Sequence, residues 1–365
     1  MKKKTAIIVP AHNESEVIGL TISSLLQLVK QKDIYVINDG STDDTSNIAK
    51  SYGVHVLDIN PGKGKANAIN TAIAYFSLIE KYEYIMPVDA DTLVAPNFLD
   101  HTSKVFDKDI KEKVACVIGK VVGKDVNGVT AYRLWEYEIA QSIHKSAQSV
   151  VGAIIVCPGP STVFRSRVFE KISLPTDTIT EDMDFTFLIH RKKLGKIVYC
   201  GEAEVYTQDP QTLRDLLKQL SRWYKGFWQC VFKHKIPWGG QVLDLEVAIL
   251  ATEGLFNGIF VAVLVFMTPL VILYGSSVLL PPLIFDFVFF LVPTIAFVAR
   301  KQRKSFWSLL RYIPQFYAIR LLASILFLKS FFVTVIETQL TIHAMWNTKR
   351  YQTKKEETWP NLSVQ

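Results

Sequence analysis

The sequence predicts an α/β domain that is followed by a helical membrane region. Up to about residue 240, short apolar runs alternate with amphipathic stretches, as in proteins built from repeated strand and helix units. Residues 254–274, by contrast, carry no charge, and a helix of this length reaches across a bilayer core of roughly 30 Å. The hydrophobic share of 49% is high for a purely soluble protein, and this second part accounts for the excess.

The first part of the chain reads as strands that alternate with helices. Strands are predicted at residues 5–10, 34–38, 54–58 and 84–88, and helices at residues 16–29, 43–51 and 65–76. Repeated units of this kind imply a mostly parallel sheet with right-handed crossovers. Ligands of such sheets bind at the carboxyl ends of the strands. The polar residues that follow each predicted strand are therefore candidates for a site.

Two carboxylates, Asp89 and Asp91, directly follow the predicted strand at residues 84–88. Neighbouring carboxylates repel each other, so they stay ionised together only where a cation or hydrogen-bond donors lie between them. Hard divalent cations prefer oxygen ligands and commonly bridge a carboxylate to a phosphate. An isolated Asp-x-Asp is nevertheless more often a solvated turn after a strand.

Two further polar turns fall at the same predicted edge of the sheet. Asp39 precedes Gly40-Ser41, which is also typical of a turn with a helix cap. Gly62-Lys63-Gly64-Lys65 opens a helix, where backbone donors and a lysine can hold a phosphate, although such loops are more often only solvated. Dinucleotide and P-loop motifs are absent from the sequence. The convergence of three signals at one edge favours a ligand site over three unrelated turns.

Two acidic residues, Glu181 and Asp182, precede a predicted helix at residues 183–194. Helix capping is the alternative to a chemical role, because acids at a helix start interact favourably with the dipole. Neither reading is excluded by the sequence.

An amphipathic helix is predicted at residues 212–232, just before the first apolar run. Such a helix is expected to lie in the membrane interface. Gln219, Arg222 and Trp223 share one of its faces by their spacing. A tryptophan and arginine anchor at the lipid headgroups is the alternative, but it leaves Gln219 without a purpose.

Composition excludes several other classes of protein. The four cysteines lack metal-type spacing and suit a reducing cytosol, so neither a zinc site nor a disulfide framework is predicted. The net charge of +7 fits anionic lipid and the positive-inside rule better than nucleic acid, for which no motif is present. The apolar run at residues 5–10 is cut short by His12-Asn13-Glu14, which favours a first strand over a signal peptide.

Taken together and in order, the motifs of the chain resemble those of the processive branch of family 2 glycosyltransferases. That branch includes poly-N-acetylglucosamine, hyaluronan, chitin and cellulose synthases. The matching motifs span roughly residues 5 to 232 and are Pro10-Ala11-His12-Asn13-Glu14, Asn38-Asp39-Gly40-Ser41, Lys65-Ala66-Asn67-Ala68-Ile69-Asn70, Asp89-Ala90-Asp91, Thr180-Glu181-Asp182 and Gln219-Leu220-Ser221-Arg222-Trp223.

The resemblance implies a GT-A (Rossmann-like) nucleotide-sugar fold and an inverting transfer from a UDP-sugar, with UDP-N-acetylglucosamine the favoured donor, to a growing β-linked polysaccharide. It implies that Asp182 is the catalytic base and that Asp91 ligates Mg²⁺ or Mn²⁺. Residues implied to contact the nucleotide are Pro10, Glu14, Asp39, Lys65 and Asp89. Residues implied to meet the acceptor and the diphosphate are Glu181, Gln219, Arg222 and Trp223. Cys157-Pro158-Gly159-Pro160 matches more loosely a short loop beneath the acceptor.

Two alternative functions remain at this point. One is transfer of a single sugar to a polyprenyl phosphate or another lipid, and the other is a catalytically silent membrane subunit of a glycan export complex. Relatives of the first kind usually lack Gln-x-x-Arg-Trp. A glycosidase would need two carboxylates that flank the bond, one of them protonated, and the phosphate-binding features argue against it.

The resemblance also sets expectations for domains and location. We expect a catalytic domain at residues 1–210 that faces the cytoplasm, an interfacial helix region at 211–243, a membrane region of two to three helices at 244–345 and a basic tail at 346–365. Further apolar runs lie at 278–299 and 321–336, and whether the last one crosses the membrane is open. A few spans make a thin wall for a polysaccharide channel, so a homo-oligomer, a partner subunit or a lipid-linked acceptor is expected.

Overall fold

The computed structural model describes residues 4–123, 127–274 and 310–340, with isolated residues between 284 and 300. The chain divides into two compact units. We call the first the sheet unit, which in the described part comprises residues 4–122 and 145–208, and the second the helical unit, which comprises residues 123–144 and 209–340 where described. The basic tail, and most of the apolar run predicted at 278–299, lie outside the described residues.

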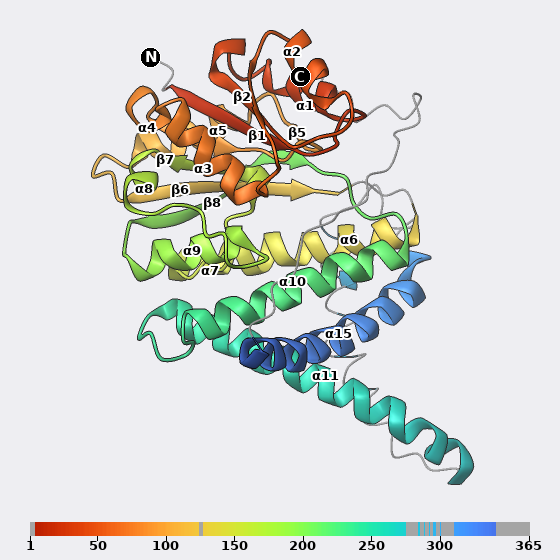
Figure 1. Cartoon of the computed structure of the whole chain (residues 1–365). Helices are drawn as coiled ribbons and strands as arrows, with labels where there is room; N and C mark the ends of the chain where they lie inside the picture. The colour runs from red at the N-terminus through yellow and green to blue at the C-terminus, as the bar shows by residue number, and fades with distance from the viewer. Residues whose placement is uncertain are drawn as a thin grey trace. The chain divides into compact units, whose positions relative to one another are not determined.

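A mixed eight-stranded sheet forms the centre of the sheet unit, in the order β3-β2-β1-β4-β7-β6-β8-β5 (Figure 1). Its strands are β1 (Thr5–Ala11), β2 (Ile34–Asp39), β3 (His55–Ile59), β4 (Tyr84–Pro87), β5 (Leu93–Val94), β6 (Val114–Val122), β7 (Thr162–Arg165) and β8 (Lys196–Tyr206). The predicted strands at the N-terminal side all form, and they pair in parallel.

The prediction of a mostly parallel sheet holds only in part, because the other half of the sheet is mixed: β6 and β8 pair in parallel, whereas other strands there do not. β7 lies antiparallel between β4 and β6, and β5 pairs antiparallel with β8. The reason is that residues 123–161 separate β7 from β6 in the sequence, and β7 then enters the sheet in the direction opposite to β6. A crossover of that length is not constrained to return parallel.

Helices pack against the strands of both halves of the sheet. They are α1 (Ile18–Leu25), α2 (Thr45–Ser51), α3 (Lys65–Tyr75), α4 (Leu78–Lys81), α5 (Phe98–Lys108), α7 (Ser146–Val151), α8 (Arg167–Lys171) and α9 (Glu181–Arg191). The helix predicted at residues 16–29 is shorter than expected, because the Glu14 carbonyl accepts the Val17 and Ile18 amides in a turn before α1.

One apolar core joins the strands to α3 and α9. Ile8, Ile37 and Ile85 come from neighbouring strands, and they share this core with Ile69 of α3 and Phe185 of α9. Each of these side chains is almost completely buried. Burial of apolar area at ~25 cal/mol per Å² stabilises this arrangement and fixes the starts of α3 and α9 against the sheet.

Long helices make up the helical unit: α6 (Gly128–Ile139), α10 (Leu213–Lys233), α11 (Val242–Tyr274) and α15 (Ile313–Leu340) (Figure 1). α6 continues into a π-helical turn at Ala140–Lys145. The predicted amphipathic helix at 212–232 forms as α10, and the Thr212 hydroxyl accepts the Asp215 amide at 3.2 Å as its N-cap.

Two helices of the described part are long and apolar enough to cross a membrane by length and composition, over Val242–Pro269 and Ile313–Glu337. α11 begins well before the uncharged run, because the Asp244 carboxylate accepts the Gly239 and Gln241 amides and so orders the chain ahead of it. α11 packs closely on α15, since a Cβ added at Gly258 would lie 2.7 Å from the Leu328 Cβ.

Candidate functional site

The polar turns predicted at one edge of the sheet are neighbours in the structure. β1 pairs with β2 up to Ala11 and Asn38, and with β4 up to Ile8 and Pro87. Because these strands are parallel, the turns that follow them emerge side by side at their carboxyl ends.

The turn after β2 is organised by Asp39. Its carboxylate accepts hydrogen bonds from the backbone amides of Lys63 and Gly64, each at 2.7 Å. The backbone of Gly62 lies so close to that of Asp39 that a Cβ on Gly62 would lie 2.5 Å from the Asp39 carbonyl oxygen. His12 Nδ1 lies 2.7 Å from that same oxygen. Asp39 therefore ties the loop after β1 and the turn before α3 to the end of β2.

The other residues predicted near the nucleotide lie at the same edge. Pro10 is part of β1. Glu14 is buried in the following turn, and its amide donates to the Thr45 hydroxyl at 2.8 Å. The structure thus brings Pro10, Glu14 and Asp39 to neighbouring strand ends, and their contact with a nucleotide stays a prediction.

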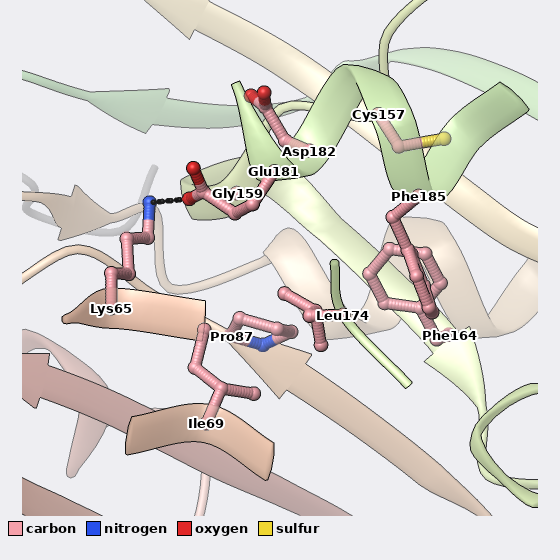
Figure 2. Close-up of a pocket in the computed structure, with 10 residues that line it drawn as sticks. All are labelled: Lys65, Ile69, Pro87, Cys157, Gly159, Phe164, Leu174, Glu181, Asp182 and Phe185. Atoms are coloured by element: carbon pink, nitrogen blue, oxygen red, sulfur yellow. Dashed lines mark ion pairs between the residues drawn. The ribbon is translucent and has the colours of Figure 1, made fainter. Parts of the chain in front are cut away.

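Lys65, the first residue of α3, is the cation of this edge. Its Nζ lies 2.6 Å from Asp89 Oδ1. It also lies 3.2 Å from Glu181 Oε1, the ion pair marked in Figure 2. Burial by itself lowers the pKa of Lys65, but the charges of Asp89, Glu181 and Asp182 outweigh burial and raise the pKa overall. Lys65 is therefore charged across the physiological range.

Asp182 lies in the first turn of α9, beside Glu181. Burial, followed by the charge of Glu181, raises the pKa of Asp182 to about 6, although Lys65 acts in the opposite direction. Its Oδ1 accepts the Met183 amide at 2.8 Å, and this amide belongs to the first turn of α9. One interaction of Asp182 therefore stabilises the helix start. A carboxyl group that titrates close to neutral pH is suited to accept a proton.

A pocket of about 320 Å³, including its opening to solvent, joins Lys65 to Asp182 (Figure 2). The two acids of α9 lie on one side of it, and its floor is apolar. The lining residues are Lys65, Ile69, Pro87, Cys157, Gly159, Phe164, Leu174, Glu181, Asp182 and Phe185. The aromatic floor excludes water, which is the physical origin of the raised pKa of Asp182.

Gly159 makes room for the lysine in this pocket. A Cβ at this position would lie 2.9 Å from Lys65 Nζ and 3.7 Å from Asp89 Oδ1. The Cys157-Pro158-Gly159-Pro160 loop, which sequence matching related only loosely to the site, therefore borders the candidate site directly. All four cysteines are free, and Cys157 Sγ lies 3.6 Å from Cys116 Sγ in the buried core.

Two residues that the sequence analysis did not identify support Asp182. The Thr186 hydroxyl donates to the Asp182 carbonyl at 2.6 Å and accepts the Cys157 amide at 2.8 Å, so it fastens the loop to α9. Lys145 ends the π-helical turn, and burial lowers its pKa to about 8 while the Cys157 and Asp182 charges raise it. Neither residue carries a sequence signal, because a π-turn and a threonine inside a helix follow no periodic pattern.

Asp91 differs from Asp89 in its surroundings. Asp89 is engaged by Lys65, whereas Asp91 is partly exposed and accepts a long contact of 3.5 Å from the Thr92 hydroxyl. Among the described residues, no group of three or more His, Cys, Asp or Glu side chains is arranged to hold a metal ion. An oxygen ligand such as Asp91 fits a hard cation that takes its remaining ligands from phosphate and water.

Gln219, Arg222 and Trp223 belong to the helical unit and lie on α10. The Gln219 Oε1 atom is buried without a hydrogen-bond partner within the described part of the chain. Arg222 and Trp223 are partly exposed, and the Trp223 ring contacts the Arg133 guanidinium at 4.6 Å. Spacing predicted a common face, and the formation of α10 as one continuous helix agrees with it.

Comparison with known proteins finds a family model that matches part of the chain. Residues 6–173 match the model of glycosyl transferase family 2. The chain is 30% identical over 246 residues to a poly-β-1,6-N-acetyl-D-glucosamine synthase of Staphylococcus epidermidis, an alignment that covers 63% of this chain and 58% of the relative. It is 31% identical over 226 residues to the synthase of the same name from Staphylococcus aureus, covering 60% of this chain and 53% of the relative. The chain thus spans little more than half the length of these relatives.

A solved structure also resembles this chain. It is the mannosyltransferase PcManGT from Pyrobaculum calidifontis, in complex with GDP-Man and Mn²⁺, with a TM-score of 0.62 at 16% sequence identity. The match covers 94% of this chain and 89% of that one, and at this identity it concerns the fold. Residues 6–173 therefore match glycosyl transferase family 2, the fold is of GT-A type, and the predicted resemblance to the processive synthases of that family is confirmed.

Proposed function

We propose that the protein is a membrane-bound inverting glycosyltransferase that transfers a sugar from a UDP-sugar to a growing β-linked polysaccharide. UDP-N-acetylglucosamine is the favoured donor, since the similar proteins from staphylococci are named for a polymer of that sugar. The observation that carries the proposal is the pocket lined by Lys65, Glu181 and Asp182, at which the Lys65 ammonium pairs with Glu181 and Asp89.

The donor is proposed to bind at the carboxyl ends of β1, β2 and β4. Pro10, Glu14 and Asp39 would face the nucleoside, and Lys65 would balance the charge that develops on the leaving diphosphate. No side chain caps the start of α3, so backbone amides at this helix start are suited to phosphate oxygens. Asp89 would hold the ammonium in place until the phosphate arrives.

Asp182 is proposed to act as the base in a single displacement. The acceptor oxygen forms its bond to the anomeric carbon while the bond from that carbon to the diphosphate oxygen breaks, and the hydroxyl proton passes to Asp182. One attack from the face opposite the leaving group inverts the anomeric configuration. Glu181 beside it keeps the local charge negative and pairs with Lys65.

A divalent cation is proposed at Asp91, in line with the Mn²⁺ of the similar solved structure. Bound there, Mg²⁺ or Mn²⁺ would add positive charge next to the leaving diphosphate. Asp91 is the residue that we assign to it, as the resemblance of Asp89-Ala90-Asp91 to the family motif implies.

The helical unit is proposed to receive the acceptor and to anchor the enzyme. Gln219, Arg222 and Trp223 would contact the acceptor and the diphosphate, while α11 and α15 would cross the membrane with the sheet unit on the cytoplasmic side. The predicted domain limits at residues 210, 243 and 345, and a homo-oligomer or partner subunit, belong to the same proposal.

Product analysis tests the proposed function. The purified protein in lipid nanodiscs, given a panel of radiolabelled UDP-sugars with Mn²⁺, is expected to form a long product from UDP-N-acetylglucosamine that a β-N-acetylglucosaminidase degrades. A product that carries one sugar on a lipid would favour the lipid acceptor instead. Absence of UDP release with every donor would contradict the assignment as an enzyme.

Replacement of the proposed base separates chemistry from binding. Asp182→Asn is expected to lower the transfer rate by about 100- to 10,000-fold, because an amide cannot take up the proton, and to leave UDP affinity nearly unchanged. The matched control is Asp177→Asn, an exposed acid just before the same helix. Turnover of the Asp182→Asn variant close to the wild-type rate would rule out this base.

The pH dependence of kcat/KM follows from the pKa of Asp182, which burial raises to about 6. Above that pH the carboxylate is ionised and accepts the proton, whereas below it the protonated acid does not. The rate constant is therefore expected to fall about tenfold per pH unit below about pH 6. UDP binding is measured over the same range as a control for folding, and a flat kcat/KM profile down to about pH 5 would speak against the assignment.

Metal dependence of nucleotide binding tests Asp91. Calorimetric titration of UDP is expected to show tighter binding when Mn²⁺ is present, and Asp91→Ala is expected to lose that gain because the cation loses its carboxylate. Asp107→Ala, an exposed acid on α5, serves as the control and should keep the gain. If wild-type protein bound UDP equally well with and without Mn²⁺, the metal role would be wrong.

A further inference from the structure

Arg133 of α6 has no role in the mechanism above, although it is one of the largest side chains that are fully buried. A buried charge is costly unless it is paired and hydrogen-bonded. Arg133 forms an ion pair with Glu136, and its Nη2 donates to the Tyr137 hydroxyl at 2.8 Å. Its Nε lies 3.6 Å from Asp209 Oδ1. The guanidinium is therefore fixed by side chains of both α6 and the segment that precedes α10.

Aromatic rings complete the surroundings of this guanidinium. Its central carbon lies 4.4 Å from the centroid of the Tyr137 ring and 4.6 Å from that of Trp223. Both distances are within the range of an attractive cation–π contact, which is strongest for tryptophan and for a cation removed from water. The Arg133 guanidinium of α6 therefore lies against the indole of α10.

Asp209 is built into the same cluster. Its Oδ1 accepts the Tyr137 hydroxyl at 3.0 Å. Its Oδ2 is buried without a hydrogen-bond partner among the described residues, and a Cβ on Gly123 would lie 2.4 Å from it. Asp209 thus occupies space that only a glycine leaves open, and it anchors Arg133 through the Tyr137 hydroxyl.

The Trp223 indole is left partly exposed by this arrangement. An aromatic face with a fixed orientation suits the apolar C–H face of a pyranose ring, and its two-torsion side chain loses little entropy if it is already held in place. Gln219, one turn earlier on α10, has a buried carbonyl oxygen for which no partner occurs in the described part, and a sugar hydroxyl could donate to it.

We propose that Arg133 is a positioning residue for the acceptor, whose anchored guanidinium holds the Trp223 indole in the orientation that receives a glycan. The inference rests on the proposed function, since it presumes that Trp223 meets the acceptor. It adds Arg133, with Tyr137 and Asp209 as its anchors, to the residues that set acceptor affinity. A lysine cannot replace this arginine, because an ammonium lacks the planar group that stacks on a ring and binds several partners at once.

Fluorine NMR tests the positioning directly and without turnover. In protein labelled with 5-fluorotryptophan, the Trp223 signal is assigned by its loss in Trp223→Phe. Arg133→Lys is expected to shift and broaden that signal. Arg311→Lys is the matched control, because the exposed Arg311 stacks on the Tyr312 ring at the same 4.6 Å. An unchanged Trp223 signal in a folded Arg133→Lys protein would overturn the inference.

The second test measures the acceptor KM with a β-linked N-acetylglucosamine oligosaccharide as the acceptor. Arg133→Lys is expected to raise the acceptor KM about tenfold, with kcat and the donor KM within about twofold of wild type. Combined with Trp223→Phe, it should add nothing further, because both changes remove the same contact. Additive effects, or an unchanged acceptor KM, would show that Arg133 has only a structural role.

A second variant and the activity of the wild type distinguish failure of the inference from misfolding and from failure of the proposed function. If Arg133→Lys does not fold, Tyr137→Phe keeps the ring but removes the hydroxyl between Arg133 and Asp209, and it is expected to move the Trp223 signal in the same direction. A Trp223 signal that Tyr137→Phe leaves unchanged would then overturn the inference. If wild-type protein transfers no sugar to the oligosaccharide, the proposed function fails, whereas the fluorine signal still decides whether Arg133 positions Trp223.

Discussion

The Lys65 ammonium is the charge on which the sheet edge depends. Three carboxylates, Asp89, Glu181 and Asp182, gather there from a strand end and a distant helix start, and without a cation between them they would repel one another. Lys65 reaches this position because α3 begins at the sheet edge and because Gly159 leaves its space free. One partly buried ion-pair cluster therefore borders the pocket, and within it burial and Glu181 raise the pKa of Asp182 while Lys65 opposes that rise.

A similar principle appears in the helical unit. Arg133 pairs with the carboxylates of Glu136 and Asp209, as Lys65 pairs with its own carboxylates. In addition, the planar guanidinium of Arg133 contacts the Trp223 ring. The two cations differ in chemistry. An ammonium is a compact charge whose carboxylate partner a phosphate can replace, whereas a guanidinium orients rings and carboxylates at fixed angles. In both clusters the burial of charge costs desolvation free energy, and the ion pairs fix the positions of the side chains.

Much of the sheet edge could be predicted from the sequence, since apolar runs of strand length end in polar turns and parallel strands bring those turns together. β1, β2 and β4 with Asp39 and Asp89 follow this rule. The antiparallel β7 does not, because no local pattern encodes the direction in which a strand returns after a long excursion. The role of Arg133 was also beyond the sequence, since its contacts with Asp209 and Trp223 come from tertiary packing. Lys145 ends a π-turn, which has no periodic signal.

The most direct measurement of the central claim is UDP affinity after removal of the Lys65 charge. Lys65→Gln, in lipid nanodiscs with Mn²⁺, is compared by calorimetry with wild type and with Lys104→Gln, an exposed lysine on α5. We expect Lys65→Gln to bind UDP at least about tenfold more weakly than wild type, and the control to bind as wild type does. Equal UDP affinity in a folded Lys65→Gln protein would show that this cation does not hold the donor.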